Sequence, residues 1–240
     1  MKMRRYATDI VFLIDATASM QPGFDDLKHD IVRFFETLDR PDEASFDEWH
    51  RWNGTFDWRA AIYAYRDIEA DGENWFESRP FVRGVAAVKD QLASLHAEGG
   101  GNGPTDLVAA LLKVSELAHQ KTDPSITESD PRHYRPIADR PVFVLTDKAC
   151  RMPSTDQLLK LNDKVCEAHI PLCLFIPAGI PCYDELSQIH RCEWTQYPVP
   201  PGGRPVVALT ELTHNIRTFT GPISGIVPRA ISPFAVGSIH

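Results

Sequence analysis

The sequence is poor in cysteine pairs, long apolar runs and blocks of positive charge. Its five Cys are an odd number without a C-x-x-C pair, which is typical of unpaired thiols in a reducing compartment. No stretch approaches the roughly 20 apolar residues that cross a bilayer, so we expect no membrane segment. Lys and Arg number 25 against 33 Asp and Glu, a net charge of -8, which argues against nucleic acid as a partner and favours cations.

The first residues resemble a secretory signal only superficially. Met1–Arg5 is basic and an apolar stretch follows, but its uncharged part spans only Ile10–Ile14, between Asp9 and Asp15. A signal core needs about 7–15 such residues. We therefore expect a cytoplasmic protein.

Short apolar runs rich in β-branched residues predict six strands. The third contains Pro80, which cannot donate to a central ladder, so it is expected at a sheet edge. The predicted strands are Thr8–Ile14, Ala60–Tyr65, Trp75–Phe81, Pro141–Thr146, Ile170–Ile176 and Glu193–Val199.

Apolar residues at steps of three and four predict helices between these strands. They fall near residues 24–38, 85–95 (ending at Gly99–Gly101), 107–117, 155–165 (capped by Ser154), 183–189 and 209–219. The alternation predicts one α/β domain over residues 1–222, with an extended tail at 223–240. Its fold is expected to be doubly wound and Rossmann-like: a mostly parallel six-stranded sheet flanked by helices, with one antiparallel edge strand.

Two insertions are longer than the connections usual in such a domain. Pro41–Asp57 is rich in aromatic residues and Lys121–Arg140 is rich in Pro. Each follows a helix and precedes a strand, so both are expected at the amino ends of the strands. Our hypothesis is that they form a second surface, opposite to any ligand site.

Acids and alcohols gather where three segments are expected to reach the carboxyl edge of the sheet. The first strand ends in Asp15-Ala16-Thr17-Ala18-Ser19, a glycine-rich loop leads to Thr105, and the fourth strand runs into Asp147. Doubly wound sheets bind ligands at this edge. These side chains offer hard oxygens, the ligands of Mg²⁺, Mn²⁺ or Ca²⁺.

D-x-T-x-S after an apolar strand, a Thr after a glycine loop and an Asp ending a later strand resemble a von Willebrand factor A (VWA) domain over roughly residues 6–220. The sequence resembles the bacterial intracellular members of this family. The resemblance implies a metal-ion-dependent adhesion site (MIDAS). It implies that Thr17 and Ser19 coordinate the ion through hydroxyls. It further implies that Thr105 does so directly or through water, and that Asp15 and Asp147 act mostly through water.

The resemblance implies a non-enzymatic protein-interaction module whose metal binds an Asp or Glu of a partner. Relatives serve bacterial multi-protein assemblies, including MoxR-type AAA+ ATPase, stress and conflict systems. One departure is Lys148, where the family commonly has Gly. This cation either weakens metal binding by repulsion or attracts the acidic partner, and we favour the second.

Several simpler interpretations remain open. Ser19 and Thr105 are also suitable helix caps, the acids suitable turn residues and the glycines a helix stop. The same cluster is the site of an alternative function, a metal-dependent hydrolase or phosphatase, although the second Asp of a haloacid-dehalogenase motif is replaced by Thr17. Nucleotide binding by the glycine loop is a weaker hypothesis, because that loop does not follow the first strand. Zinc binding by Cys182, His190 and Cys192 fits no common spacing.

Overall fold

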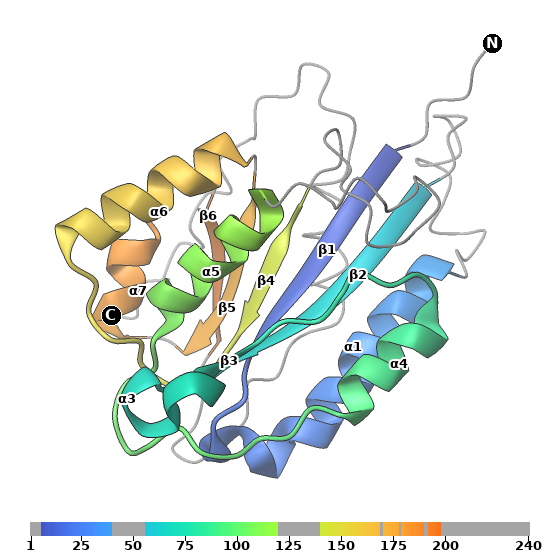
Figure 1. The fold of residues 1–240 in the computed structure, drawn as a ribbon, viewed down its shortest axis with the longest axis horizontal. Coiled ribbons are helices and arrows are strands. Elements are labelled where there is room, and N and C mark those ends of the chain that lie inside the picture. The colour runs from blue at the N-terminus through green and yellow to red at the C-terminus, as the bar shows by residue number, and fades with distance from the viewer. Residues whose placement is uncertain are drawn as a thin grey trace, which may run out of the picture.

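A six-stranded sheet forms the middle of the molecule, in the order β3-β2-β1-β4-β5-β6 (Figure 1). The computed structural model describes residues 6–39, 56–119, 140–168, 170–177, 179–189 and 192–197. All neighbouring strands are parallel except β2 and β3, which are antiparallel. The strands are Tyr6–Asp15 (β1), Phe56–Tyr65 (β2), Phe76–Glu77 (β3), Val142–Leu145 (β4), Leu172–Pro177 (β5) and Cys192–Tyr197 (β6). The predicted α/β fold, with its mostly parallel sheet and antiparallel edge strand, is confirmed.

Helices cover both faces of the sheet (Figure 1). Packing against one face are α1 and α4, and against the other α5, α6 and α7. The helices are Phe24–Asp39 (α1), Ile68–Asp71 (α3), Val85–Ala93 (α4), Leu107–His119 (α5), Thr155–Glu167 (α6) and Pro181–Leu186 (α7), with 3-10 turns at Ala18–Gly23 (η1) and Gly72–Trp75 (η2).

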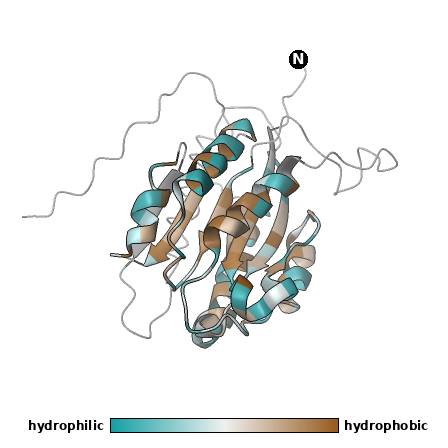
Figure 2. Cartoon of the chain, turned by 60° about the vertical axis from the view of Figure 1, so that its left-hand side comes forward, coloured by the Kyte–Doolittle hydropathy of each residue, from teal (hydrophilic) through white to brown (hydrophobic). Residues whose placement is uncertain are grey.

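The central strand β1 is buried on both faces because helices cover both sides of the sheet. Successive side chains of the strand point to opposite sides and so enter two different cores. Phe12 lies on the α1 side, where its ring centroid is 5.8 Å from that of Phe34. Val11 and Leu13 lie on the other side, in the core formed with α5, α6 and α7. Figure 2 shows the resulting pattern, with apolar residues along the strands and hydrophilic ones on the outer faces of the helices.

Most predicted boundaries are shifted by a few residues, and the structure shows a cause for two of the shifts. The third strand ends at Glu77; beyond it, Val82 forms only an isolated bridge with Ala60, while the Pro80 carbonyl accepts a hydrogen bond from Gln91. The helix expected to end at the glycines ends instead at Ala93, because the following segment pairs with the chain after β1.

The cysteine prediction was wrong for one pair. Cys150 and Cys182 form a disulfide, with their Cα atoms 5.9 Å apart. The fold brings the loop after β4 against α7, and a sequence separation of 32 residues gives no sign of this. Cys182 is therefore not a free zinc ligand.

Other predictions fall outside the described residues: His190 and the Cys192 side chain, the helix near 209–219, the tail at 223–240, nearly all of both insertions and hence the hypothesis of a second surface. Of the helices that are described, none combines the length and apolar character needed to span a bilayer.

Candidate metal site

The strand order reverses between β1 and β4, and the predicted site lies at the carboxyl ends of these two strands. Ile14 pairs with Leu145, so Asp15 and Thr146 follow side by side. In doubly wound sheets this reversal opens a crevice, since the connections on either side lead to opposite faces.

Asp15 forms the floor of the site and is fully buried. Its Oδ1 accepts a hydrogen bond from the Thr17 amide at 3.0 Å, and its Oδ2 accepts one from the Thr146 hydroxyl at 2.7 Å. Burial raises the pKa of the Asp15 carboxyl despite these donors, and the nearby Asp147 carboxylate raises it further. A bound cation would relieve this penalty on the ionised form.

A chain of side-chain hydrogen bonds leads from the floor to the surface. The Thr17 and Ser19 hydroxyl oxygens lie 3.0 Å apart, and Ser19 Oγ donates to Asp147 Oδ1 at 3.0 Å. Thr17 is buried, Ser19 is exposed and Asp147 is partly exposed. Four predicted site residues, Asp15 included, are thus directly connected, although Ser19 and Asp147 are 128 positions apart.

The backbone of Thr105 is hydrogen-bonded to the loop after β4, which carries Asp147. Its amide donates to the Ala149 carbonyl at 2.9 Å and its carbonyl accepts from the Arg151 amide at 2.8 Å. The side chain is fully buried, yet its Oγ1 has no hydrogen bond of normal geometry among the described residues. The buried Tyr65 hydroxyl, which interacts with it, is likewise without such a bond. Buried hydroxyls almost always have one. An oxygen in this state is suited to bind a metal ion or a metal-bound water.

The glycine loop packs directly on the first motif. At Gly100, where φ is +79°, a Cβ would lie 2.2 Å from Thr17 Cγ2, so no larger residue fits. The Ala18 amide donates to the Gly99 carbonyl at 3.2 Å. The Gly100 amide donates to an Asp71 carboxylate oxygen at 2.9 Å and is therefore not free to hold a phosphate.

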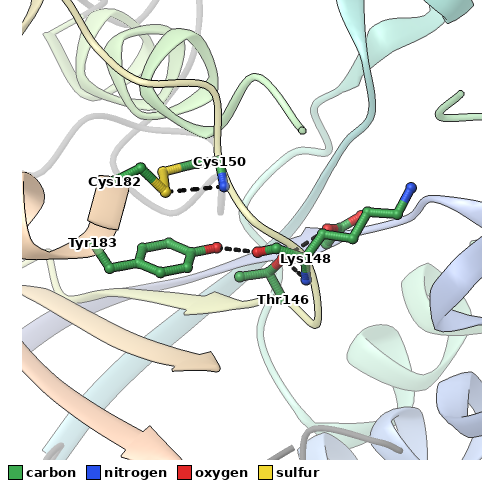
Figure 3. Close-up of a disulfide and its surroundings, with 6 residues drawn as sticks. Thr146, Lys148, Cys150, Cys182 and Tyr183 are labelled. Atoms are coloured by element: carbon green, nitrogen blue, oxygen red, sulfur yellow. Dashed lines mark hydrogen bonds between the residues drawn. A yellow bond between two sulfur atoms is a disulfide. The ribbon is translucent and has the colours of Figure 1, made fainter. Parts of the chain in front are cut away.

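Lys148 follows Asp147 in the loop after β4, and its side chain contacts the glycine loop. Its Nζ donates to the Gly100 carbonyl at 3.3 Å and to the Gly101 carbonyl at 3.2 Å. Its own carbonyl accepts a hydrogen bond from the Tyr183 hydroxyl of α7 (Figure 3). Burial raises the pKa of the Asp147 carboxyl, while the Ser19 hydroxyl and the Lys148 ammonium act in the opposite direction.

The capping interpretation does not describe these hydroxyls. Thr17 precedes η1 but makes no side-chain cap bond, and Ser19 donates to Asp147. Within the described ranges, Thr105 Oγ1 accepts no hydrogen bond from an amide. A true cap nearby is Asp67, whose carboxylate accepts from the Glu69 and Ala70 amides at the start of α3.

Sequence reasoning did not assign a role to Thr146. Its hydroxyl donates to Asp15 and also accepts a hydrogen bond from the Lys148 amide at 3.2 Å. A hydroxyl at the buried end of an otherwise apolar strand was the available signal, because such a group needs a partner.

In the described parts of the chain, no three His, Cys, Asp or Glu side chains are grouped so that they could hold a metal ion. The cluster has two carboxylates, and its remaining donors are the hydroxyls of Thr17, Ser19 and Thr105. This set fits a hard cation that keeps several waters, such as Mg²⁺.

Comparisons with protein-family models and with curated protein sequences find no match. Among solved structures, the fold is similar to that of proximal thread matrix protein 1 from the mussel byssus, with a TM-score of 0.53 and 14% sequence identity. The match covers 91% of this chain and 48% of that protein, so this chain spans about half of its length. At this identity the similarity concerns the fold alone.

Proposed function

We propose that the chain is a VWA-type module that binds a divalent metal at a MIDAS and, through it, an acidic residue of a partner protein. The observation that carries this proposal is the connected line of Thr17, Ser19 and Asp147 with the unpartnered Thr105 hydroxyl beside it. It combines hard oxygen donors with an opening to solvent at Ser19.

Thr17, Ser19 and Thr105 would hold the ion, with Asp15 and Asp147 acting mostly through water. Mg²⁺, or Mn²⁺ or Ca²⁺, would supply a Lewis-acidic centre for a carboxylate. Neutral hydroxyls cancel less of the cation's charge than carboxylates do. Asp15, fully buried, adds negative charge beneath the site and orients Thr17 through the Thr17 amide.

A non-enzymatic role agrees better with this geometry than the alternative of a hydrolase or phosphatase. The acid that would attack a phosphoryl group, Asp15, is fully buried, and both of its oxygens accept hydrogen bonds. A nucleophile needs an approach path to the reacting atom. Phosphatase turnover lost on changing Asp15 would overturn this choice.

The setting is part of the proposal. The family resemblance favours a bacterial multi-protein assembly, such as a MoxR-type AAA+ ATPase system, and the cytoplasm. The Cys150–Cys182 disulfide argues against a reducing compartment, where such bonds are rare. Alkylation of the thiols in intact cells decides the point, since a bond intact in the cell contradicts the cytoplasmic placement.

The test of the function is calorimetric titration of the metal-free protein with Mg²⁺ and Mn²⁺. We expect saturable binding that falls at least about tenfold in Ser19→Ala, because a ligand oxygen is lost. Ser94→Ala is the matched control, since its hydroxyl accepts from Arg79 on the surface. Absence of binding, or equal binding by Ser19→Ala, would contradict the proposal.

A further inference from the structure

A pocket with a volume of about 540 Å³ opens beside the candidate metal site. Its walls come from the two loops that carry Thr105 and Asp147 and from the start of α7. Side chains of Lys148, Met152, Ile180 and Pro181 line it, together with the Cys150–Cys182 disulfide. Lys148 and Asn102, which also lines the pocket, are its polar side chains, and the other side chains are apolar.

The pocket and the site are continuous along the chain. Gly103 and Pro104, which line the pocket, immediately precede Thr105, and Lys148 immediately follows Asp147. Consecutive Cα atoms are about 3.8 Å apart, so the rim of the pocket begins within one residue of the site. An extended peptide advances about 3.3 Å per residue and therefore reaches both with residues that are close in its sequence.

The walls are held rigidly for a loop region. The Cys150 amide donates to Cys182 Sγ at 3.0 Å, and the Tyr183 hydroxyl donates to the Lys148 carbonyl (Figure 3). Cys150 also forms a bridge with Thr105. A volume of this size is within the range of small-ligand sites. Walls that are already ordered reduce the entropy lost on binding.

The charge and exposure at the rim select the occupant. Met152 is 57% exposed, and the Lys148 ammonium contacts carbonyls without an ion pair to a described carboxylate. A partner acid approaching the site is attracted by this cation. A partner side chain entering the pocket meets methionine, isoleucine, proline and a disulfide.

We infer that the pocket receives a large apolar side chain that lies within a few residues of the partner's acidic residue. The recognised element is thus a short segment with one Asp or Glu and one Leu, Met or Phe. This inference rests on the proposed function: the acid binds at the metal and the apolar residue determines which acidic segments are selected. Lys148 then assists the acid and accounts for the departure from Gly.

The probes are fluorescently labelled Gly/Ser heptapeptides containing one Asp and one Leu, with the Leu placed at each position from three before to three after the Asp. Binding is followed by anisotropy in Mg²⁺. We expect at least one spacing to bind about tenfold tighter than the same peptide with Ser for Leu, because burying a Leu side chain contributes enough for such a ratio.

Two variants locate the effect. Met152→Ser should abolish the advantage of Leu, whereas Leu159→Ser should keep it, because Leu159 is similarly exposed at 59% but lies on α6 outside the pocket. Equal, Mg²⁺-dependent binding of all Asp peptides would contradict the role inferred for the pocket, but it would agree with the proposed metal-dependent function.

The remaining outcomes are also decisive. Absence of any Mg²⁺-dependent peptide binding would overturn the proposed function together with this inference. Equal binding of Leu peptides that carry Asn for Asp, or equal binding in chelator, would show an apolar site independent of the metal and would overturn the coupling.

Discussion

Thr105 and Thr146 are both buried at the candidate site, but their hydroxyls differ in hydrogen bonding. Thr146 Oγ1 donates to Asp15 at 2.7 Å, whereas Thr105 Oγ1 has no partner among the residues described. The first bond supports the fold of the metal-free protein. The second hydroxyl contributes little to that state and is available to a ligand.

Replacing each by Val, which keeps the shape, separates these roles. In chelator, Thr146→Val should lower the free energy of unfolding by about 2 kcal/mol, since a bond to a charged buried group is lost. Thr105→Val should change it by less than about 0.5 kcal/mol, yet weaken Mg²⁺ binding. Urea denaturation with and without Mg²⁺ measures both, and equal losses of stability would contradict the assignment.

Tyr63 gives the fold a dependence on alkaline pH. Burial, with the Asp9 carboxylate as a second cause, raises the pKa of Tyr63 to about 12 from 10.0. Above pH 10 the unfolded chain releases this proton while the folded chain keeps it, so the free energy of unfolding falls as pH rises from 10 towards 12. The full loss is about 3 kcal/mol.

Urea denaturation of the wild type and of Tyr63→Phe at pH 9 and at pH 11 tests this. The variant should lose less stability between the two values, because it has no phenol to ionise. Identical losses would show that Tyr63 titrates normally in the folded protein.

At the scale of elements, α7 and the loop after β4 act as one unit. Besides the disulfide, the Cys150 amide and the Lys148 carbonyl both bond to α7. The loop that carries Asp147 is therefore anchored on the side away from β1.

Removing the disulfide in a Cys150→Ala, Cys182→Ala double variant should lower the free energy of unfolding by about 3 kcal/mol, because the cross-link closes a loop of 32 positions. Thermal melts check this. Dithiothreitol should lower the melting temperature of the wild type but not of the double variant, and Cys166→Ala, which changes a free thiol, should behave as wild type. An effect of the reductant on neither protein would contradict the bond.

The sequence predicted elements well where a local rule decided them. Ser154 caps α6 through a full capping box with Gln157, a pattern visible in four consecutive residues. The end of α4 could not be predicted, since it depends on pairing of Glu98 with Ala16, a contact with the chain just after β1 that no local rule contains. The disulfide was missed for the same reason.

The candidate site was predictable because the fold rule is general: acids and alcohols at the ends of parallel strands meet at one edge. That rule placed Asp15, Thr17, Ser19 and Asp147 together, and the structure joins them by hydrogen bonds. It did not place the pocket beside them, which depends on where α7 packs.

For the whole molecule, the two ends of the sheet have separate roles. At the amino ends, Asp9 and Arg59 pair through two hydrogen bonds of 2.8 and 2.7 Å and are almost fully buried. Asp9 precedes Asp15 by six positions of β1, roughly 20 Å along the strand. A change in the Asp9–Arg59 pair should therefore leave the metal affinity at the other end unchanged.

Asp9→Asn should lower the free energy of unfolding by about 1.5–3 kcal/mol, because the charge-assisted hydrogen bonds to the buried Arg59 guanidinium are weakened. Mg²⁺ affinity of the folded fraction should stay unchanged. Glu36→Gln is the control: Glu36 pairs with Lys89 and both side chains are about half exposed, so the loss should be under about 1 kcal/mol. A loss of metal affinity in Asp9→Asn would show that the two ends are coupled.

A crystal structure of the protein soaked in Mn²⁺, with an anomalous difference map, would show directly whether the cluster binds a metal ion. We expect one strong peak contacted by the Thr17 and Ser19 hydroxyls, with Thr105 and Asp147 facing it directly or through water. A map without a peak there, or with those side chains turned away from one another, would contradict the proposed metal site.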